Sequence, residues 1–152
     1  MHGGPVFWNG SKPTVFVWNE SHPLKGYALT AAGQLGTNPS STSAIGYNPP
    51  HPGAIVTASS NGTMAATGVV WASTLTQAVS GTYDSAWHHI VAGELYAFDA
   101  EDVSKMLWSS EQNAADSLGL FAKFCPPIVV NGKVYVGTAT TTNAVRVYGL
   151  KP

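Results

Sequence analysis

The densest cluster of side chains that could do chemistry lies in residues 83–89. It contains the carboxylate of Asp84, the indole of Trp87 and the adjacent imidazoles of His88 and His89. A neutral imidazole beside a carboxylate can act as a general base or bind a metal ion. Because adjacent side chains on an extended backbone point to opposite faces, we expect one histidine to reach a site while the other packs away. Asp84, His88 and His89 are therefore the candidate catalytic residues, and Trp87 is a candidate ligand-binding residue.

A second candidate ligand-binding residue is Glu94, which opens a predicted strand where it could face the same site. The alternative role of a carboxylate at this position is to cap a turn. Three further acidic residues, Asp99, Glu101 and Asp102, crowd one tight turn. Aspartate side chains in turns bind nearby backbone amides, so we predict turn roles for these three.

The remaining histidines, His2, His22 and His51, each stand beside Pro or Gly in predicted loops, and we expect them to be ordinary loop residues. No His-x-His spacing and no second thiol supports a metal site, so the sequence predicts no metal centre. The single cysteine, Cys125, precedes a buried-looking strand and is predicted to be a small core residue. A nucleophile elbow and a phosphate-binding glycine loop are also missing from the sequence.

The composition limits the class of protein. Charged residues make up 10% of the 152 residues, against about 25% in an ordinary soluble domain. Apolar segments alternate with polar neutral turns rich in Gly and Pro, which favours an all-β fold. The chain has a formal net charge of −1 and no basic cluster for phosphates, no apolar run long enough to span a membrane and no signal-peptide pattern. We therefore expect neither nucleic acid nor a membrane as a partner.

Repeated hairpin patterns are present near both ends of the chain. Apolar runs over residues 5–8 and 127–130 each lead into an Asn-Gly pair, at positions 9–10 and 131–132, and another strand follows each pair. Asn-Gly between two apolar runs favours a tight β-hairpin. The sequence therefore predicts two matching hairpins.

A third strand recurs three times, over residues 24–29, 95–100 and 145–150, with apolar and small or polar residues alternating at period two. After the second copy, a polar turn leads to a fourth strand over residues 105–109, which contains Trp108. Four antiparallel strands in a repeated unit are typical of a β-propeller blade.

Residues 93–100, then 107–108 and then 126–138 resemble the repeat of quinoprotein-like (pyrroloquinoline-quinone-type) β-propellers. The resemblance covers nearly all of the chain. It implies that the chain is a C-terminal fragment of a longer bacterial protein, and the longer relatives are expected to be periplasmic or secreted. The localisation of this chain stays open. In such repeats a closing tryptophan packs between neighbouring blades, and Trp108 matches that position.

The predicted architecture is a partial β-propeller of about three four-stranded blades, over residues 1–37, 53–110 and 124–150, with the last blade incomplete. Long loops are predicted over 36–52 and 74–92, and a short helical turn within 111–123. A propeller normally closes with about four to eight blades, so this arc would expose apolar packing surfaces at both flanks. We therefore expect a homo-oligomer, with a dimer completing a ring of about six blades.

Three hypotheses for the function follow. The first is a non-catalytic module that self-associates and binds a ligand or partner at the channel mouth. The second is a hydrolase, acting on a lactone or glycoside through Asp84, His88 and His89 at the mouth of the assembled ring. The third, implied by the resemblance, is a quinone-dependent oxidoreductase.

The residues do not support the third hypothesis. The resemblance implies stacking tryptophans, in many dehydrogenases an adjacent cysteine pair, and calcium ligands; this chain has no adjacent cysteines and no position matched to a calcium ligand or catalytic aspartate. We therefore predict no cofactor. Whether the chain is an enzyme stays open, with hydrolysis favoured over redox chemistry.

Overall fold

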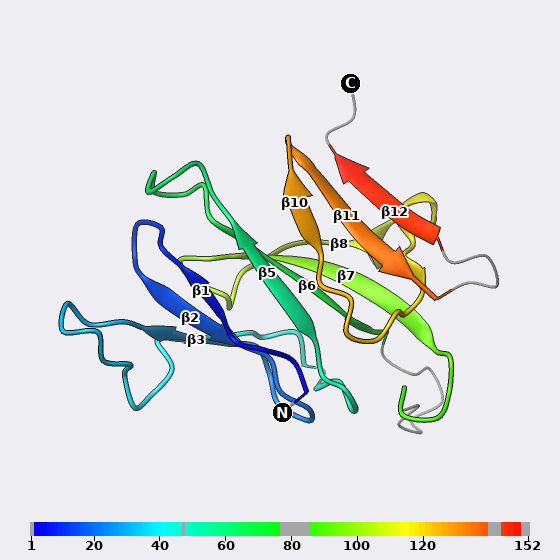
Figure 1. Ribbon diagram of the computed structural model, residues 1–152, viewed down its shortest axis with the longest axis horizontal. Coiled ribbons are helices and arrows are strands. Elements are labelled where there is room, and N and C mark those ends of the chain that lie inside the picture. Colours follow the sequence, from blue (N-terminus) through cyan, green and yellow to red (C-terminus); the bar gives the residue numbers. More distant parts are fainter. Residues whose placement is uncertain (1, 47, 77–85, 140–143, 150–152) are drawn as a thin grey trace.

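The computed structural model describes residues 2–46, 48–76, 86–139 and 144–149 (Figure 1). Within these ranges the chain forms three antiparallel sheets of four, five and three strands, with two short 3₁₀ helices. The predicted all-β class is confirmed. In the described part of the chain, no helix has the length and apolar character needed to cross a membrane.

The first sheet contains, in spatial order, β1 (Val6–Trp8), β2 (Thr14–Val17), β3 (Lys25–Ala28) and β4 (Ser41–Thr42). Most of the described residues in the predicted loop 36–52 form no strand, but β4 lies within it and pairs with β3. Serine hydroxyls on both sides of β4 hold it against β3 by hydrogen bonds to the backbone. Ser40 Oγ donates to the Gly26 carbonyl at 3.0 Å, and Ser43 Oγ accepts from the Leu24 amide at 3.0 Å.

The middle sheet contains β5 (Ile55–Ser59), β6 (Val69–Leu75), β7 (Ala92–Asp99) and β8 (Met106–Ser109), and a short β9 (Gly119–Leu120) also pairs with β7. The sequence does not predict β9. Its approach depends on Gly93, because a Cβ there would lie 2.9 Å from Phe121 Cα. The predicted insertion at 74–92 separates β6 from β7, and its residues 77–85 lie outside the described ranges.

The third sheet contains β10 (Ile128–Val130), β11 (Lys133–Thr138) and β12 (Ala144–Gly149). Asn131 and Gly132 have φ values of 50° and 69°, the left-handed conformation that a two-residue type I′ turn requires. The predicted C-terminal hairpin is therefore confirmed. The predicted N-terminal hairpin forms with a longer loop over residues 9–13, so its Asn-Gly pair does not make a two-residue turn.

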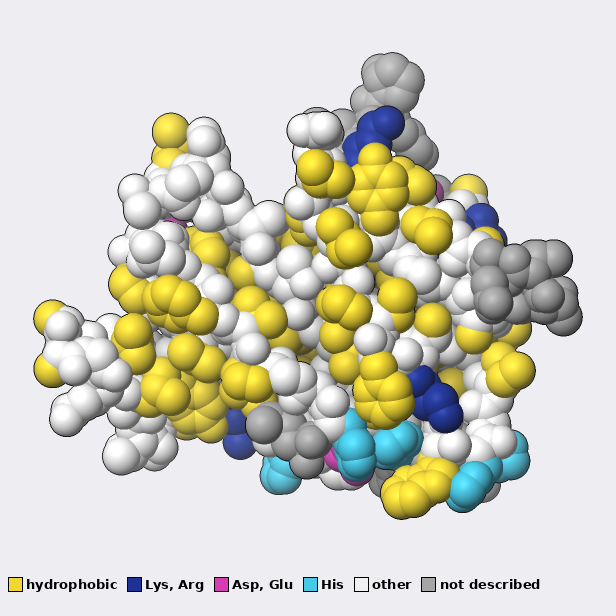
Figure 2. All heavy atoms as spheres, viewed as in Figure 1, with side chains coloured by type: hydrophobic (Ala, Val, Ile, Leu, Met, Phe, Trp, Pro, Cys, Tyr) yellow, Lys and Arg dark blue, Asp and Glu magenta, His cyan; other side chains and the backbone are white. Residues whose placement is uncertain are grey.

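The three sheets stack face to face, with the middle sheet between the other two (Figure 1). The first strands of the sheets lie side by side, because β5 contacts both β1 and β10. Figure 2 shows apolar side chains spread over the face on which these three strands lie. The described residues form no closed barrel or complete ring.

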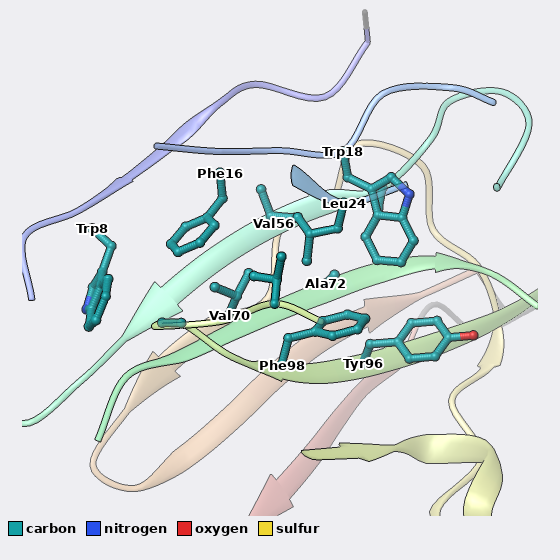
Figure 3. Close-up of a cluster of buried hydrophobic side chains, with 12 residues drawn as sticks. Trp8, Phe16, Trp18, Leu24, Val56, Val70, Ala72, Tyr96 and Phe98 are labelled. Carbon is teal, nitrogen blue, oxygen red and sulfur yellow. The ribbon is translucent and has the colours of Figure 1, made fainter. Parts of the chain in front are cut away.

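Two cores hold the stack together. Between the first and middle sheets, Trp18 packs on Phe98 with ring centroids 5.8 Å apart (Figure 3). Between the middle and third sheets, Leu95 packs in a cluster with Val134 and Val136. The middle sheet therefore buries both of its faces, and each outer sheet buries only one.

Trp108 lies in the second core, between the middle and third sheets. Its ring packs edge-on against Tyr148, with centroids 5.5 Å apart. After β8, the 3₁₀ helices η1 (Ser110–Gln112) and η2 (Ala114–Asp116) confirm the predicted helical turn within residues 111–123.

The indole of Trp8 fits between two glycines. A Cβ at Gly10 would lie 1.9 Å from Trp8 Cζ2, and a Cβ at Gly68 would lie 2.3 Å from the same atom. The indole has no free space to move into, because Trp8 is 4% exposed and its Nε1–H donates to Ser60 Oγ at 3.0 Å. These glycines are therefore required by the packing of the ring.

We predict that Gly68→Ala lowers the free energy of unfolding by about 1–3 kcal/mol, as overpacked core substitutions do. Gly4→Ala is the matched control, because a Cβ at Gly4 meets nothing within 4 Å, and its effect is expected within about 0.5 kcal/mol. Urea denaturation of the three proteins measures both values. Equal stability of the Gly68 variant and the wild type would contradict this packing.

Candidate functional site

Loops from all three sheets meet at one edge of the stack, which we call the loop edge. His2 precedes β1, Glu20 follows β2, His51 precedes β5, Trp87 precedes β7 and Phe124 precedes β10. In antiparallel sheets the start of one strand and the end of the next lie at the same edge, so these five positions converge. Figure 2 shows histidine side chains gathered along this edge.

At the centre of the loop edge, His2, Glu20 and His51 form what we call the His-Glu-His cluster. Nδ1 of His51 lies 2.9 Å from Oε1 of Glu20, and Nδ1 of His2 contacts the same oxygen. The two imidazole rings are 4.4 Å apart between centroids and tilted by 72°. Three side chains that could bind a cation therefore meet at one point.

Two glycines allow the backbones that carry this cluster to approach each other. Gly53 has a φ of 82°, and a Cβ there would lie 2.9 Å from the Glu20 backbone nitrogen. Gly3 packs closely against the start of the middle sheet. A Cβ added at Gly3 would lie 2.5 Å from the Ala54 carbonyl oxygen. Each glycine is next to or near a histidine in sequence, so the close approach places both imidazoles beside Glu20.

Backbone hydrogen bonds fix the same loops. The Ser21 amide donates to the Pro49 carbonyl at 2.8 Å, which joins the loop after β2 to the loop before β5. The Ala86 amide donates to the His51 carbonyl at 3.1 Å, which joins the loop before β7 to the same segment. The cluster is therefore held by the main chain as well as by its own side chains.

The histidines also determine the charge state of Glu20. Partial burial raises the pKa of the Glu20 carboxyl. Hydrogen bonds and charge interactions with His2 and His51 lower this pKa, and together they outweigh the effect of burial. The net pKa lies below its ordinary value, so the carboxylate is ionised at neutral pH.

Aromatic side chains surround the cluster. The ring of Trp87 lies 4.9 Å from that of His51, and the ring of Phe124 lies 6.2 Å from His51 on an edge-on approach. Lys123 Nζ donates to the Trp87 carbonyl at 3.2 Å. The predicted ligand-binding residue Trp87 thus lies beside the His-Glu-His cluster at the loop edge, and its side chain is largely exposed.

His88 and His89 lie next to the cluster, along a shallow depression of about 410 Å³. Trp87, Phe121 and Lys123 also line it. Both histidines are exposed, so the expectation that one would pack away is wrong. The reason is local: residues 86–89 form a turn, where adjacent side chains do not alternate as they do along an extended strand.

Glu94, the other predicted site residue that the structure describes, does not line this depression. Asp84 lies outside the described residues. Glu94 is 8% exposed in β7, where its carboxyl is hydrogen-bonded to Ser109 and Tyr96. Burial raises the pKa of this carboxyl above its ordinary value, and the negative charge of Glu111 raises it further against the opposing hydrogen bonds.

A second hollow, of about 510 Å³, opens between the middle and third sheets. Trp71, Trp108, Asp116 and Tyr148 line it. Burial raises the pKa of the Tyr148 hydroxyl to about 12. The hollow lies against the second core and contains none of the described histidines.

The chain was compared with protein-family models, with curated proteins and with solved structures, and none of the three comparisons found a match.

We predict that Glu94→Gln increases stability at neutral pH. A carboxyl whose pKa is raised by folding stabilises the protein fully below its ordinary value of 4.5, and this contribution is lost as the pH rises through the folded pKa. The advantage of Glu94→Gln should therefore grow from pH 4 to pH 8, measured by thermal unfolding.

Glu101→Gln is the matched control of opposite sign. Hydrogen bonds from Ser11 and from the Ala66 amide lower the pKa of Glu101, so its contribution is present above 4.5 and is lost as the pH falls. This variant should lose stability at neutral pH. Equal pH profiles for both variants would contradict the two assignments.

Proposed function

We propose that the chain is a propeller-type module of three blades that associates with a second copy of itself and binds a ligand at its loop edge. Three features support the blade assignment: the face-to-face stack, the side-by-side position of β1, β5 and β10, and Trp108 between two sheets. In a propeller these first strands would line the central channel, and the loop edge would be its mouth.

The observation that carries self-association is the open apolar face of the third sheet. Ile128, Tyr135 and Val147 form one row across its three strands, on the side opposite the buried Val134 and Val136. Ile128 is 60% exposed and Val147 is 52% exposed. A contiguous apolar face of this kind on a sheet is typical of a surface that packs against another sheet.

The first sheet has a matching open face. Phe7, Val15 and Tyr27 form a row across β1, β2 and β3, and Phe7 is 54% exposed. The chain already packs sheets face to face twice, so the third sheet of one copy and the first sheet of another can repeat that contact. The net charge of −1 adds little repulsion between copies. Two such head-to-tail contacts would close a ring of six sheets.

We predict a mass in solution of twice the 15.9 kDa of one chain. Val147→Lys should shift the protein to the monomer, because a charge would be buried in the contact. Met64→Lys is the matched control, since Met64 is 59% exposed but belongs to the loop between β5 and β6. Light scattering coupled to size-exclusion chromatography measures all three. A monomeric wild type, or equal masses for both variants, would refute self-association through this face.

A pair of opposite charges tests the head-to-tail arrangement. Phe7→Lys alone and Ile128→Glu alone should each give monomers, while the double variant should regain part of the dimer because the first strands β1 and β10 of the two copies would lie side by side and the two charges would then meet across the contact. If the third sheet of each copy packs against the other third sheet instead, the double variant stays monomeric.

One observation favours a second candidate, hydrolysis of a lactone or glycoside: His88 and His89 line the same depression beside Lys123. If an imidazole there acts as a general base, His88→Ala or His89→Ala should lower turnover by about 10²-fold or more. The assay uses a panel of esters, lactones and glycosides, and the mass in solution should not change. Unchanged turnover in both variants would exclude this site.

A further inference from the structure

We propose that the His-Glu-His cluster is a binding site for one divalent transition-metal ion, and that this ion is zinc. His2 lies in the segment before β1, Glu20 in the loop after β2 and His51 in the loop before β5, yet each offers a ligand atom within 4.8 Å of the others. Two imidazoles and one carboxylate form a donor set that zinc uses in proteins where a fourth position is left open.

The distances are close to those of a bound ion. With metal–ligand bonds of about 2.0–2.2 Å, the donor atoms around a tetrahedral zinc lie about 3.3–3.6 Å apart. The Nδ1 atom of His51 already lies 2.9 Å from Oε1 of Glu20.

Backbone contacts hold the segments that carry the cluster. Gly3, Gly53 and the hydrogen bond from Ser21 to Pro49 place the loops. The side chains of His51 and Glu20 are 13% and 32% exposed, while that of His2 is 44% exposed. The cluster is therefore partly desolvated on one side and open to water on the other, which leaves room for a water or ligand atom in the fourth position.

The donor types select the class of ion. Calcium and magnesium prefer oxygen ligands, and the cluster has two nitrogen donors for one carboxylate. Imidazole with carboxylate suits zinc and neighbouring transition metals. The carboxylate of Glu20 also supplies negative charge beside a divalent cation bound at the cluster.

This inference rests on the proposed function only in that it names the ligand of the loop edge. All three donors belong to one chain, so the site does not require a second copy. The Val147→Lys variant, which is expected to be monomeric, should therefore bind zinc as the wild type does. This arm of the experiment separates a failure of self-association from a failure of metal binding.

The test is isothermal titration of the chelator-treated full chain with zinc chloride. We expect one zinc ion per chain, and Glu20→Gln and His2→Gln should each weaken the affinity more than tenfold. Both replacements put a neutral polar side chain in place of a metal ligand, and circular dichroism checks that each variant is folded. His22→Gln and the double variant His88→Gln/His89→Gln are the controls, and both should bind zinc as the wild type does.

A second measurement, the visible spectrum of bound Co²⁺, reports on the coordination of the ion itself. Bound Co²⁺ absorbs visible light with an intensity that depends on its coordination number, so the wild type should give a saturable spectrum that Glu20→Gln weakens and zinc displaces. The absence of binding overturns the proposal. Binding that survives Glu20→Gln and His2→Gln, or that is lost in the His88/His89 double variant, overturns it as well.

Discussion

The packing of the middle sheet on both of its faces is the constraint on which the rest of the structure depends. Along β7, Phe98 packs against Trp18 of the first sheet, while its near neighbour Leu95 packs in the cluster with Val134 of the third sheet. A slip of one residue in the pairing of β7 would exchange these two sets of side chains. The register of the middle sheet is therefore set from both sides, and each outer sheet aligns its single buried face on it.

The same stacking produces the loop edge. His2 and Glu20 enter it from the first sheet, and His51 enters it from the start of the middle sheet. These side chains therefore meet only if the strand ends of the two stacked sheets lie at the same level. The approach is close enough that Gly3 and Gly53 have no space for a side chain. The fold thus places a carboxylate between two imidazoles as a consequence of sheet packing, and the proposed metal site would use an arrangement that the backbone already provides.

Much of the fold could be predicted from local pattern. The long strands β6, β7, β11 and β12 are rich in apolar residues, and Asn131-Gly132 predicts its own turn, because these signals lie within a few neighbouring residues. The short strands β4 and β9 could not be predicted, since their serine, threonine and glycine residues have no strand pattern and pair only because neighbouring strands supply partners. The exposed cluster around Trp87 was visible as a run in the sequence. The His-Glu-His cluster was not, because its members are 18 and 31 residues apart and meet only through packing; the glycines beside the histidines are the one local signal.

Amide hydrogen exchange tests the dependence on the middle sheet most directly. If the two cores on either side of it hold the molecule together, the slowest amides lie in β6 and β7, and they exchange only when the whole protein unfolds. The amides of β4 and β12, at the edges of the outer sheets, should exchange through smaller and more frequent openings. Slowest exchange in the first or third sheet, with β6 and β7 opening independently of global unfolding, would contradict the account.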